Sequence, residues 1–199
     1  MRKIIISTFI VFMATISFAK NQGDTHLSDH LTFKGVPIDG SLSEFVSEMK
    51  KKGFTMLGAE DGMALLEGDF AAFKKCTLGI VTLKQKDLVS KATVIFPSQD
   101  TWSSLSSDYF TLKELLTEKY GEPSDVVEEF QTHSQVIDNN YKMFIVRNNE
   151  CNYYTTYETE KGTIRLSIEY KNFFGSFVML SYNDKINTEI IKTEALKDL

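Results

Sequence analysis

The same order of elements occurs twice along this chain of 199 residues: one amphipathic helix pattern, followed by several short strand patterns. The first helix pattern is SLSEFVSEMKKKG, residues 41–53, and the second is DTWSSLSSDYFTLKELLTEKYG, residues 100–121. Each begins with a residue type that caps helices, ends at a glycine, and carries apolar residues at intervals of three and four. No segment between the strands can serve as a crossover helix, so we expect antiparallel pairing.

This repetition predicts an α+β fold made of two tandem helix-plus-antiparallel-sheet units, with the helices on one face of the sheet. The first unit is expected at residues 31–98 and the second at 99–183, and residues 184–199 form a C-terminal helix or tail. Two unrelated α+β halves are the alternative. The strands are predicted at residues 54–57, 63–67, 70–73, 78–84, 88–96, 126–131, 141–146, 152–159, 163–170 and 176–182.

The first residues, MRKIIISTFIVFMATISFA, are typical of a secretory signal peptide. Arg2 and Lys3 precede an apolar run, and small residues stand at Ser17 and Ala19, which predicts cleavage after residue 19. The run is short for a membrane-spanning helix, and we expect no transmembrane segment after cleavage. The protein is therefore predicted to be periplasmic or secreted, with residues 20–30 as a mobile leader.

The charge of the mature chain argues against nucleic acid as a partner. Removing Arg2 and Lys3 from the 22 basic residues leaves 20 against 27 acidic residues, a net charge of −7. Nucleic acids and anionic membranes both require a basic face.

Two hairpin patterns indicate which side of the sheet faces water. In VTLKQKDLVSKATVIF, residues 81–96, a turn at Lys86-Asp87 predicts that Val81 faces the core and Thr82 faces outward. In TTYETEKGTIRLSIEY, residues 155–170, a turn at Lys161-Gly162 predicts that Glu158 lies opposite Arg165 and forms an ion pair with it. The helices must cover the apolar face, which leaves the other face open, basic in the first half and acidic in the second.

This open face supplies the candidate partner-binding residues. They are Thr82, Lys84, Lys91, Thr93, Ile95, Tyr154, Thr156, Glu158, Arg165 and Glu169.

The chain resembles the beta-lactamase inhibitor protein family, and exported proteins of gut bacteria that share its tandem fold. The segments FKGVPIDGSLSEFVSEMKKKGF and TWSSLSSDYFTLKELLTEKYGEP, each with its hairpin, carry the resemblance. It implies a concave sheet that grips a partner protein. That family has a disulfide in each unit, whereas this chain has one cysteine per unit, and no contact residue of the inhibitor matches by motif.

The two cysteines, Cys76 and Cys151, leave two interpretations open. An oxidising compartment permits a disulfide between them. Two buried free thiols are the alternative, because sequence fixes neither the distance nor the geometry of the pair.

The sequence carries no catalytic, phosphate-binding or zinc signature. His26 and His30 have helical ligand spacing but lie in the polar leader, and His133 lies in a polar stretch without a serine or cysteine at a known spacing. Glu128 and Glu129 are expected on opposite sheet faces. Tyr153, Tyr154 and Tyr157 could stack on a sugar or peptide, but the alternation assigns two of the three to the core.

We therefore expect a non-catalytic exported protein without a cofactor or metal, which holds a protein or peptide on the open sheet face. An envelope-assembly or structural factor is the alternative. A hydrolase is the least favoured reading.

Overall fold

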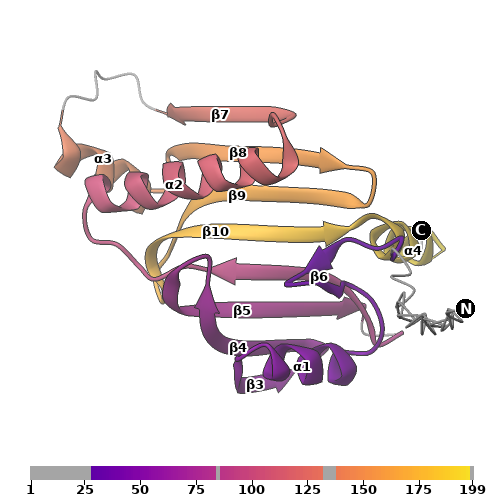
Figure 1. Cartoon of the computed structure of the whole chain (residues 1–199). Coiled ribbons are helices and arrows are strands. Elements are labelled where there is room, and N and C mark those ends of the chain that lie inside the picture. Colours follow the sequence, from indigo (N-terminus) through magenta and orange to yellow (C-terminus); the bar gives the residue numbers. More distant parts are fainter. Residues whose placement is uncertain (1–27, 84–85, 132–137, 198–199) are drawn as a thin grey trace, which may run out of the picture.

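The computed structural model describes residues 28–83, 86–131 and 138–197 (Figure 1). The expected signal peptide, leader residues 20–27 with His26, and the candidate residues Lys84 and His133 lie outside the described residues. The elements in chain order are β1 (Thr32–Phe33), β2 (Val36–Pro37), α1 (Leu42–Lys51), β3 (Thr55–Glu60), β4 (Met63–Phe70), β5 (Phe73–Leu83), β6 (Leu88–Ile95), α2 (Trp102–Tyr120), β7 (Asp125–Phe130), α3 (Asn139–Arg147), β8 (Cys151–Thr159), β9 (Gly162–Lys171), β10 (Gly175–Asp184) and α4 (Lys185–Leu196).

The fold is α+β, and its long strands form a single eight-stranded antiparallel sheet. The strand order is β3-β4-β5-β6-β10-β9-β8-β7, and β1 with β2 forms a separate two-stranded sheet. The middle of the large sheet is the pairing of β6 with β10, in which Val94 lies opposite Leu180. The strands of both halves of the chain therefore share one ladder.

Helices α1 and α2 begin where the sequence places good capping residues. The Ser41 hydroxyl accepts from the Glu44 amide and the Glu44 carboxylate accepts from the Ser41 amide, which confirms the predicted capping box. In α2 the cap is Thr101, one residue later than Asp100, which the sequence favoured. Gly121 ends α2 at φ +83°, a conformation that suits glycine.

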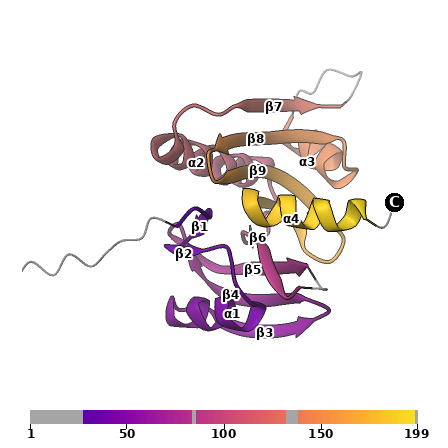
Figure 2. The same cartoon turned by 90° about the vertical axis from the view of Figure 1, so that its right-hand side faces the viewer.

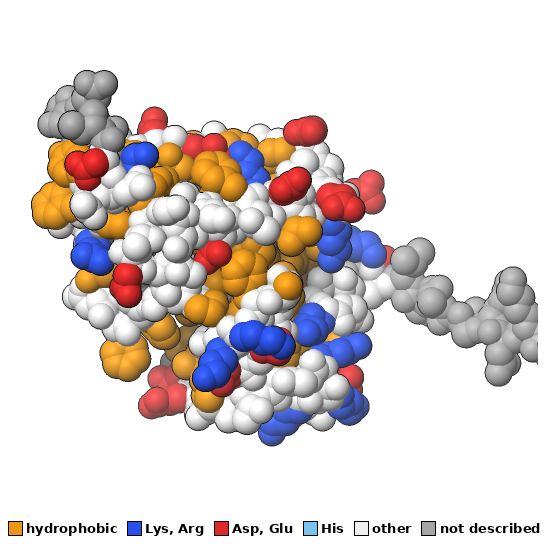
Figure 3. Space-filling model, turned by 60° about the vertical axis from the view of Figure 1, so that its left-hand side comes forward, with side chains coloured by type: hydrophobic (Ala, Val, Ile, Leu, Met, Phe, Trp, Pro, Cys, Tyr) orange, Lys and Arg blue, Asp and Glu red, His pale blue; other side chains and the backbone are white. Residues whose placement is uncertain are grey.

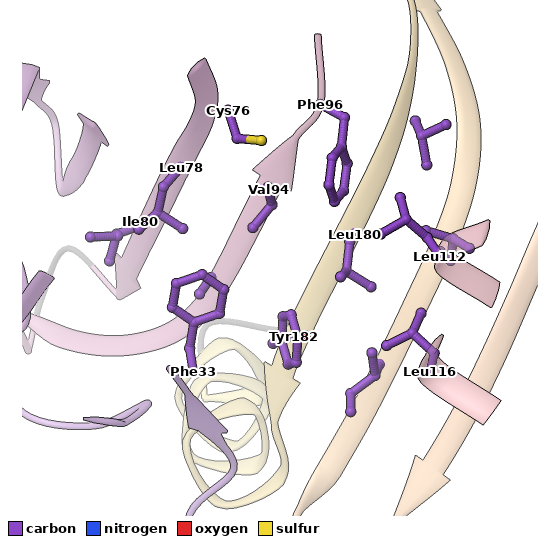
Figure 4. Close-up of a cluster of buried hydrophobic side chains, with 14 of the residues drawn as sticks. Phe33, Cys76, Leu78, Ile80, Val94, Phe96, Leu112, Leu116, Leu180 and Tyr182 are labelled. Atoms are coloured by element: carbon purple, nitrogen blue, oxygen red, sulfur yellow. The ribbon is translucent and has the colours of Figure 1, made fainter. Parts of the chain in front are cut away.

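One continuous apolar core lies between these helices and the sheet. Helices α1 and α2 lie on the same side of the sheet (Figure 2), and their buried residues include Phe45 and Leu112. Figure 4 shows Leu78 and Val94 from one half of the chain beside Leu180 and Leu112 from the other, with Phe33 of β1 close to Tyr182. The core therefore crosses the boundary between the halves without a break.

Helices α3 and α4 pack at opposite ends of the strands, so the expectation of all helices on one sheet face holds for α1 and α2 alone. Helix α3 contacts α2 and the adjoining ends of β9 and β10, while α4 contacts β6, β9 and β10 at their other ends. The predicted strand at residues 141–146 is wrong, because this segment is part of α3. Asp138 caps it by accepting from the Tyr141 amide at 2.9 Å, and Met143 and Val146, three residues apart, enter the core.

A buried polar junction ties the start of the described chain to α4. The Asp184 carboxylate is fully buried, accepts from the amides of Leu31 and Asn187 at 2.8 Å each, and lies 3.0 Å from His30 Nδ1. The Asn187 amide group in turn donates to the Val89 carbonyl at 2.8 Å. These bonds join His30, at the end of the expected leader, to the rest of the fold. Of the two alternatives for residues 184–199, helix or tail, the structure has a helix at Lys185–Leu196.

Candidate binding face

The sheet face opposite α1 and α2, here called the open face, is apolar across its first half. Its apolar half consists of Met63, Leu65, Val81, Ile95 and Met179, which lie in neighbouring strands. Met63 and Leu65 are 51% and 42% exposed. Glu67 and Lys91, one acidic and one basic, also lie on this part of the face, and Lys84 lies outside the described residues, so the described residues alone do not form the predicted basic surface.

Candidate residues of the first hairpin are divided between the two faces. Lys91, Thr93 and Ile95 lie on the open face and are half-buried. Thr82 was predicted on that face and instead continues the core-facing alternation of Leu78 and Ile80.

The correction at Thr82 has a local cause. The β5–β6 register shifts between Val81 and Thr82, and the Thr82 hydroxyl donates to the Gly62 carbonyl at 2.8 Å. A hydroxyl with a bonded partner can be buried at low cost. Val81 therefore lies on the open face, although the sequence favoured the core.

The second hairpin turns one residue before the predicted position, which moves the pairing between β8 and β9 by two residues. Thr159 pairs with Gly162, so Glu160 and Lys161 form the turn, and Thr156 rather than Glu158 lies opposite Arg165. A shift of two residues changes the partners but keeps every side chain on its predicted face. Tyr154, Thr156, Glu158, Arg165 and Glu169 thus lie on the open face, and they form its polar half together with Asn152, Ser167 and Asp125.

The predicted ion pair between Glu158 and Arg165 is absent, and each side chain has another neighbour. The Arg165 guanidinium carbon lies 3.7 Å from the centre of the Tyr154 ring, a close cation–π contact. Glu158 accepts from the Thr163 hydroxyl at 2.8 Å. Loss of solvent and a hydrogen bond with the Asp125 carboxylate raise the pKa of Tyr154, which keeps the phenol neutral. Arg165 has no ion pair among the described residues.

A polar pocket of about 210 Å³ opens beside this pair, between the end of α3 and strands β8 and β9. Tyr154, Arg165 and Glu169 line it together with Asn152 and Ser167, which the sequence analysis missed. The buried Ser167 hydroxyl donates to Glu169 at 2.8 Å. The alternation of β9 placed Ser167 on the same face as Arg165, and this signal could have identified it. The pocket offers hydrogen bonds and one cation to a polar group of a partner.

Thr156, on the same face, has an unsatisfied polar atom. Its residue is 8% exposed, and its Oγ1 has no hydrogen-bond partner among the described residues. A buried hydroxyl without a partner is uncommon in folded proteins.

The described residues form no constellation typical of catalysis. Glu128 forms an ion pair with Lys113 and also accepts from the Tyr109 hydroxyl, whereas Glu129 belongs to the opposite sheet face, as predicted. Tyr157 is buried and Tyr153 packs against the core, which confirms that Tyr154 alone of the three tyrosines is on the open face. In the described part of the chain, no group of three or more His, Cys, Asp or Glu side chains could hold a metal ion.

Cys76 and Cys151 are free thiols, so the disulfide interpretation is wrong. Cys76 lies in β5 and Cys151 in β8, and β6, β10 and β9 separate these strands. Four strand spacings correspond to roughly 19 Å, whereas the Cα atoms of a disulfide lie within about 7 Å of each other.

Comparison of the chain with family models, curated proteins and solved structures finds no match. Among the described helices, none is both long enough and apolar enough to span a membrane.

Proposed function

We propose that the open face binds another protein or a peptide, and that the protein acts without catalysis. One observation carries this proposal. The apolar half of the open face, with Met63 and Leu65 exposed to solvent, borders the polar half, which contains Tyr154 and Arg165. Contiguous exposed apolar surface beside polar residues is typical of protein interaction sites. Tyrosine and arginine are among the residue types that contribute most to binding energy.

A row of small side chains on the open face favours an extended partner segment. Gly79, Thr93 and Ser181 are paired in one row across β5, β6 and β10, and the Thr93 and Ser181 hydroxyls lie 3.2 Å apart. The side chains of this row are small, and the Leu65 side chain lies beside Gly79 at its end. A partner main chain that follows this row would therefore also contact Leu65.

The finer organisation of the fold is part of the same proposal. Helix α1 with β3 to β6 and helix α2 with β7 to β10 would be two tandem units joined at β6 and β10. The mirrored strand order around that pairing supports this division. It would make the chain similar in architecture to the beta-lactamase inhibitor protein family, and we propose export to the periplasm or the exterior on the basis of residues 1–19.

The test uses a change on the apolar half. Leu65→Glu places a charge where a partner would bury an apolar group, and Leu115→Glu, at 46% exposure on α2, is the matched control. The wild-type protein first captures candidates from an envelope extract, and each purified candidate is then titrated by biolayer interferometry. Leu65→Glu should weaken the true partner at least about tenfold, or 1.4 kcal/mol, and the control should not.

The polar half has its own variant in the same experiment. Arg165→Ala removes the cation–π contact and the cation of the pocket. Candidates that bind the wild type, Leu65→Glu and Arg165→Ala with equal affinity would contradict the proposal.

A further inference from the structure

Strand β7 is the outermost strand on its side of the large sheet (Figure 1), and β8 is its neighbour. The Gln131 amide donates to the Glu150 carbonyl at 2.7 Å, which fixes the phase of the ladder between β7 and β8. Because bonded and non-bonded pairs alternate along an antiparallel ladder, Val127 and Glu129 bond to β8, while Val126 and Glu128 point their main-chain groups outward. A row of main-chain donors and acceptors therefore faces away from the sheet.

A shallow groove of about 780 Å³ runs between this edge and α2. We call it the edge groove; it is lined by Phe110, Lys113, Glu114, Thr117, Glu118, Glu122, Pro123 and Val126. Phe110 is 45% exposed and Val126 is 40% exposed. In Figure 3, the top of the molecule shows hydrophobic side chains among acidic ones. The groove thus has apolar contacts beside an unpaired strand edge.

The charge of the edge groove is acidic. Lys113, the only basic residue among those that line the groove, forms an ion pair with Glu128, so its charge is already balanced. Glu114 and Glu118 of α2, and Glu122 just past its end, line the groove, and none of the three forms an ion pair in the described part of the chain. An occupant with basic side chains would complement these carboxylates.

We propose that the edge groove binds an extended, basic segment of another protein, which adds to the sheet as a strand beside β7. Main-chain hydrogen bonds to the strand edge would supply affinity, and alternate side chains directed toward α2 would supply selectivity. Pairing of β7 with the β7 strand of a second copy of this chain is less favourable. Asp125, Glu128 and Glu129 would then lie close to the same acidic residues of the other copy. The edge groove is separate from the open face, so this proposal does not depend on the proposed function.

The probe is a short acetylated and amidated peptide of alternating lysine and valine, carrying a fluorophore, with a glutamate-for-lysine peptide as its matched control. Fluorescence anisotropy with the full chain measures both affinities. We expect the lysine peptide to bind at least about tenfold more tightly than the glutamate peptide. Amide hydrogen exchange in the wild-type protein should slow at Val126 and Glu128 when the lysine peptide is added.

Two variants separate strand addition from simple charge attraction. Val126→Pro removes an outward N–H, which the sheet does not use, and Glu118→Lys with Glu122→Lys reverses the charge of the groove. Each should weaken the lysine peptide at least about tenfold, and circular dichroism verifies that each variant is folded. Glu160→Lys in the β8–β9 turn and Ile186→Glu on α4, both away from the edge groove and the open face, should leave peptide affinity unchanged.

Equal affinity for the two peptides, or unchanged hydrogen exchange at Val126 and Glu128, would overturn the proposal. A third result would also overturn it: the Glu118→Lys, Glu122→Lys variant binds the lysine peptide weakly, but a folded Val126→Pro variant binds it as tightly as the wild type. Charge attraction alone would then explain the binding. If Val126→Pro does not fold, the exchange measurement in the wild-type protein decides. Loss of the open-face partner through Leu65→Glu would have no bearing on these results.

Discussion

At the residue scale, both thiols have low reactivity because Cys76 is buried and Cys151 is partly buried. Burial raises the pKa of Cys76 to about 11 and that of Cys151 to about 12, and the Glu169 carboxylate adds to the effect at Cys151. The thiolate is the reactive form of cysteine. The fold therefore keeps both cysteines mostly protonated and unreactive at neutral pH.

We predict that the folded protein reacts very slowly with a thiol reagent at neutral pH, and that denaturant exposes two reactive thiols. The raised pKa values mean that the reaction of the folded protein accelerates as the pH rises toward 11. Titration with a chromogenic disulfide, with and without denaturant, measures both states. A denatured, unreduced protein with no titratable thiol would show that the cysteines are bonded.

At the element scale, the β8–β9 turn is determined by one close approach. A Cβ atom on Gly162 would lie 2.1 Å from the Asn183 carbonyl oxygen of β10, and Gly162 has φ +151°, a region that side chains rarely adopt. The residue is thus needed inside the ladder, where it pairs with Thr159, and cannot be the second residue of the turn. This is why the turn lies one residue before its predicted position, with the strand pairing moved by two residues.

Gly162→Ala should destabilise the protein by about 3 kcal/mol or more, because backbone must move to admit the methyl group. Gly53→Ala is the matched control, since Gly53 also has a positive φ, +94°, but has no atom within 4 Å of the added Cβ. It should cost about 1–2 kcal/mol. Urea unfolding measures both, and equal losses would contradict the argument from close approach.

The same scale explains how much of the fold the sequence predicts. Helices α1 and α2 could be predicted from their apolar periodicity and capping residues. The side chains of the β8–β9 hairpin lie on their predicted faces because the error in the strand pairing is two residues, an even number. Helix α3 was mistaken for a strand because YKMFIV, residues 141–146, is short and rich in β-formers, while the cap at Asp138 is a weak signal. The apolar half of the open face was missed because Ala64, Leu65 and Leu66 are consecutive, so alternation assigns neither face.

At the scale of the whole molecule, the shared ladder and the continuous core make the halves depend on each other. The pairing of β6 with β10 lies in the middle of the sheet, and Phe33 from the first half packs against Tyr182 from the second. Separating the halves would expose two strand edges and part of the core at once. The two halves should therefore unfold together.

We predict one cooperative unfolding transition. Trp102, the single tryptophan, is buried in α2 and reports the second half by fluorescence, while far-ultraviolet circular dichroism reports both halves. The two urea curves should coincide, as expected for a two-state transition. A fluorescence midpoint displaced from the circular dichroism midpoint would show that the halves unfold separately.

The buried polar junction at Asp184 also limits how early in synthesis the fold can be completed. His30 and its carboxylate partner are separated by 154 positions, and Asn187 joins them from still later in the chain. During synthesis these bonds can therefore form only once the chain through Asn187 has left the ribosome. Until then, the segment at His30 and Leu31 has no carboxylate to fix it to the sheet.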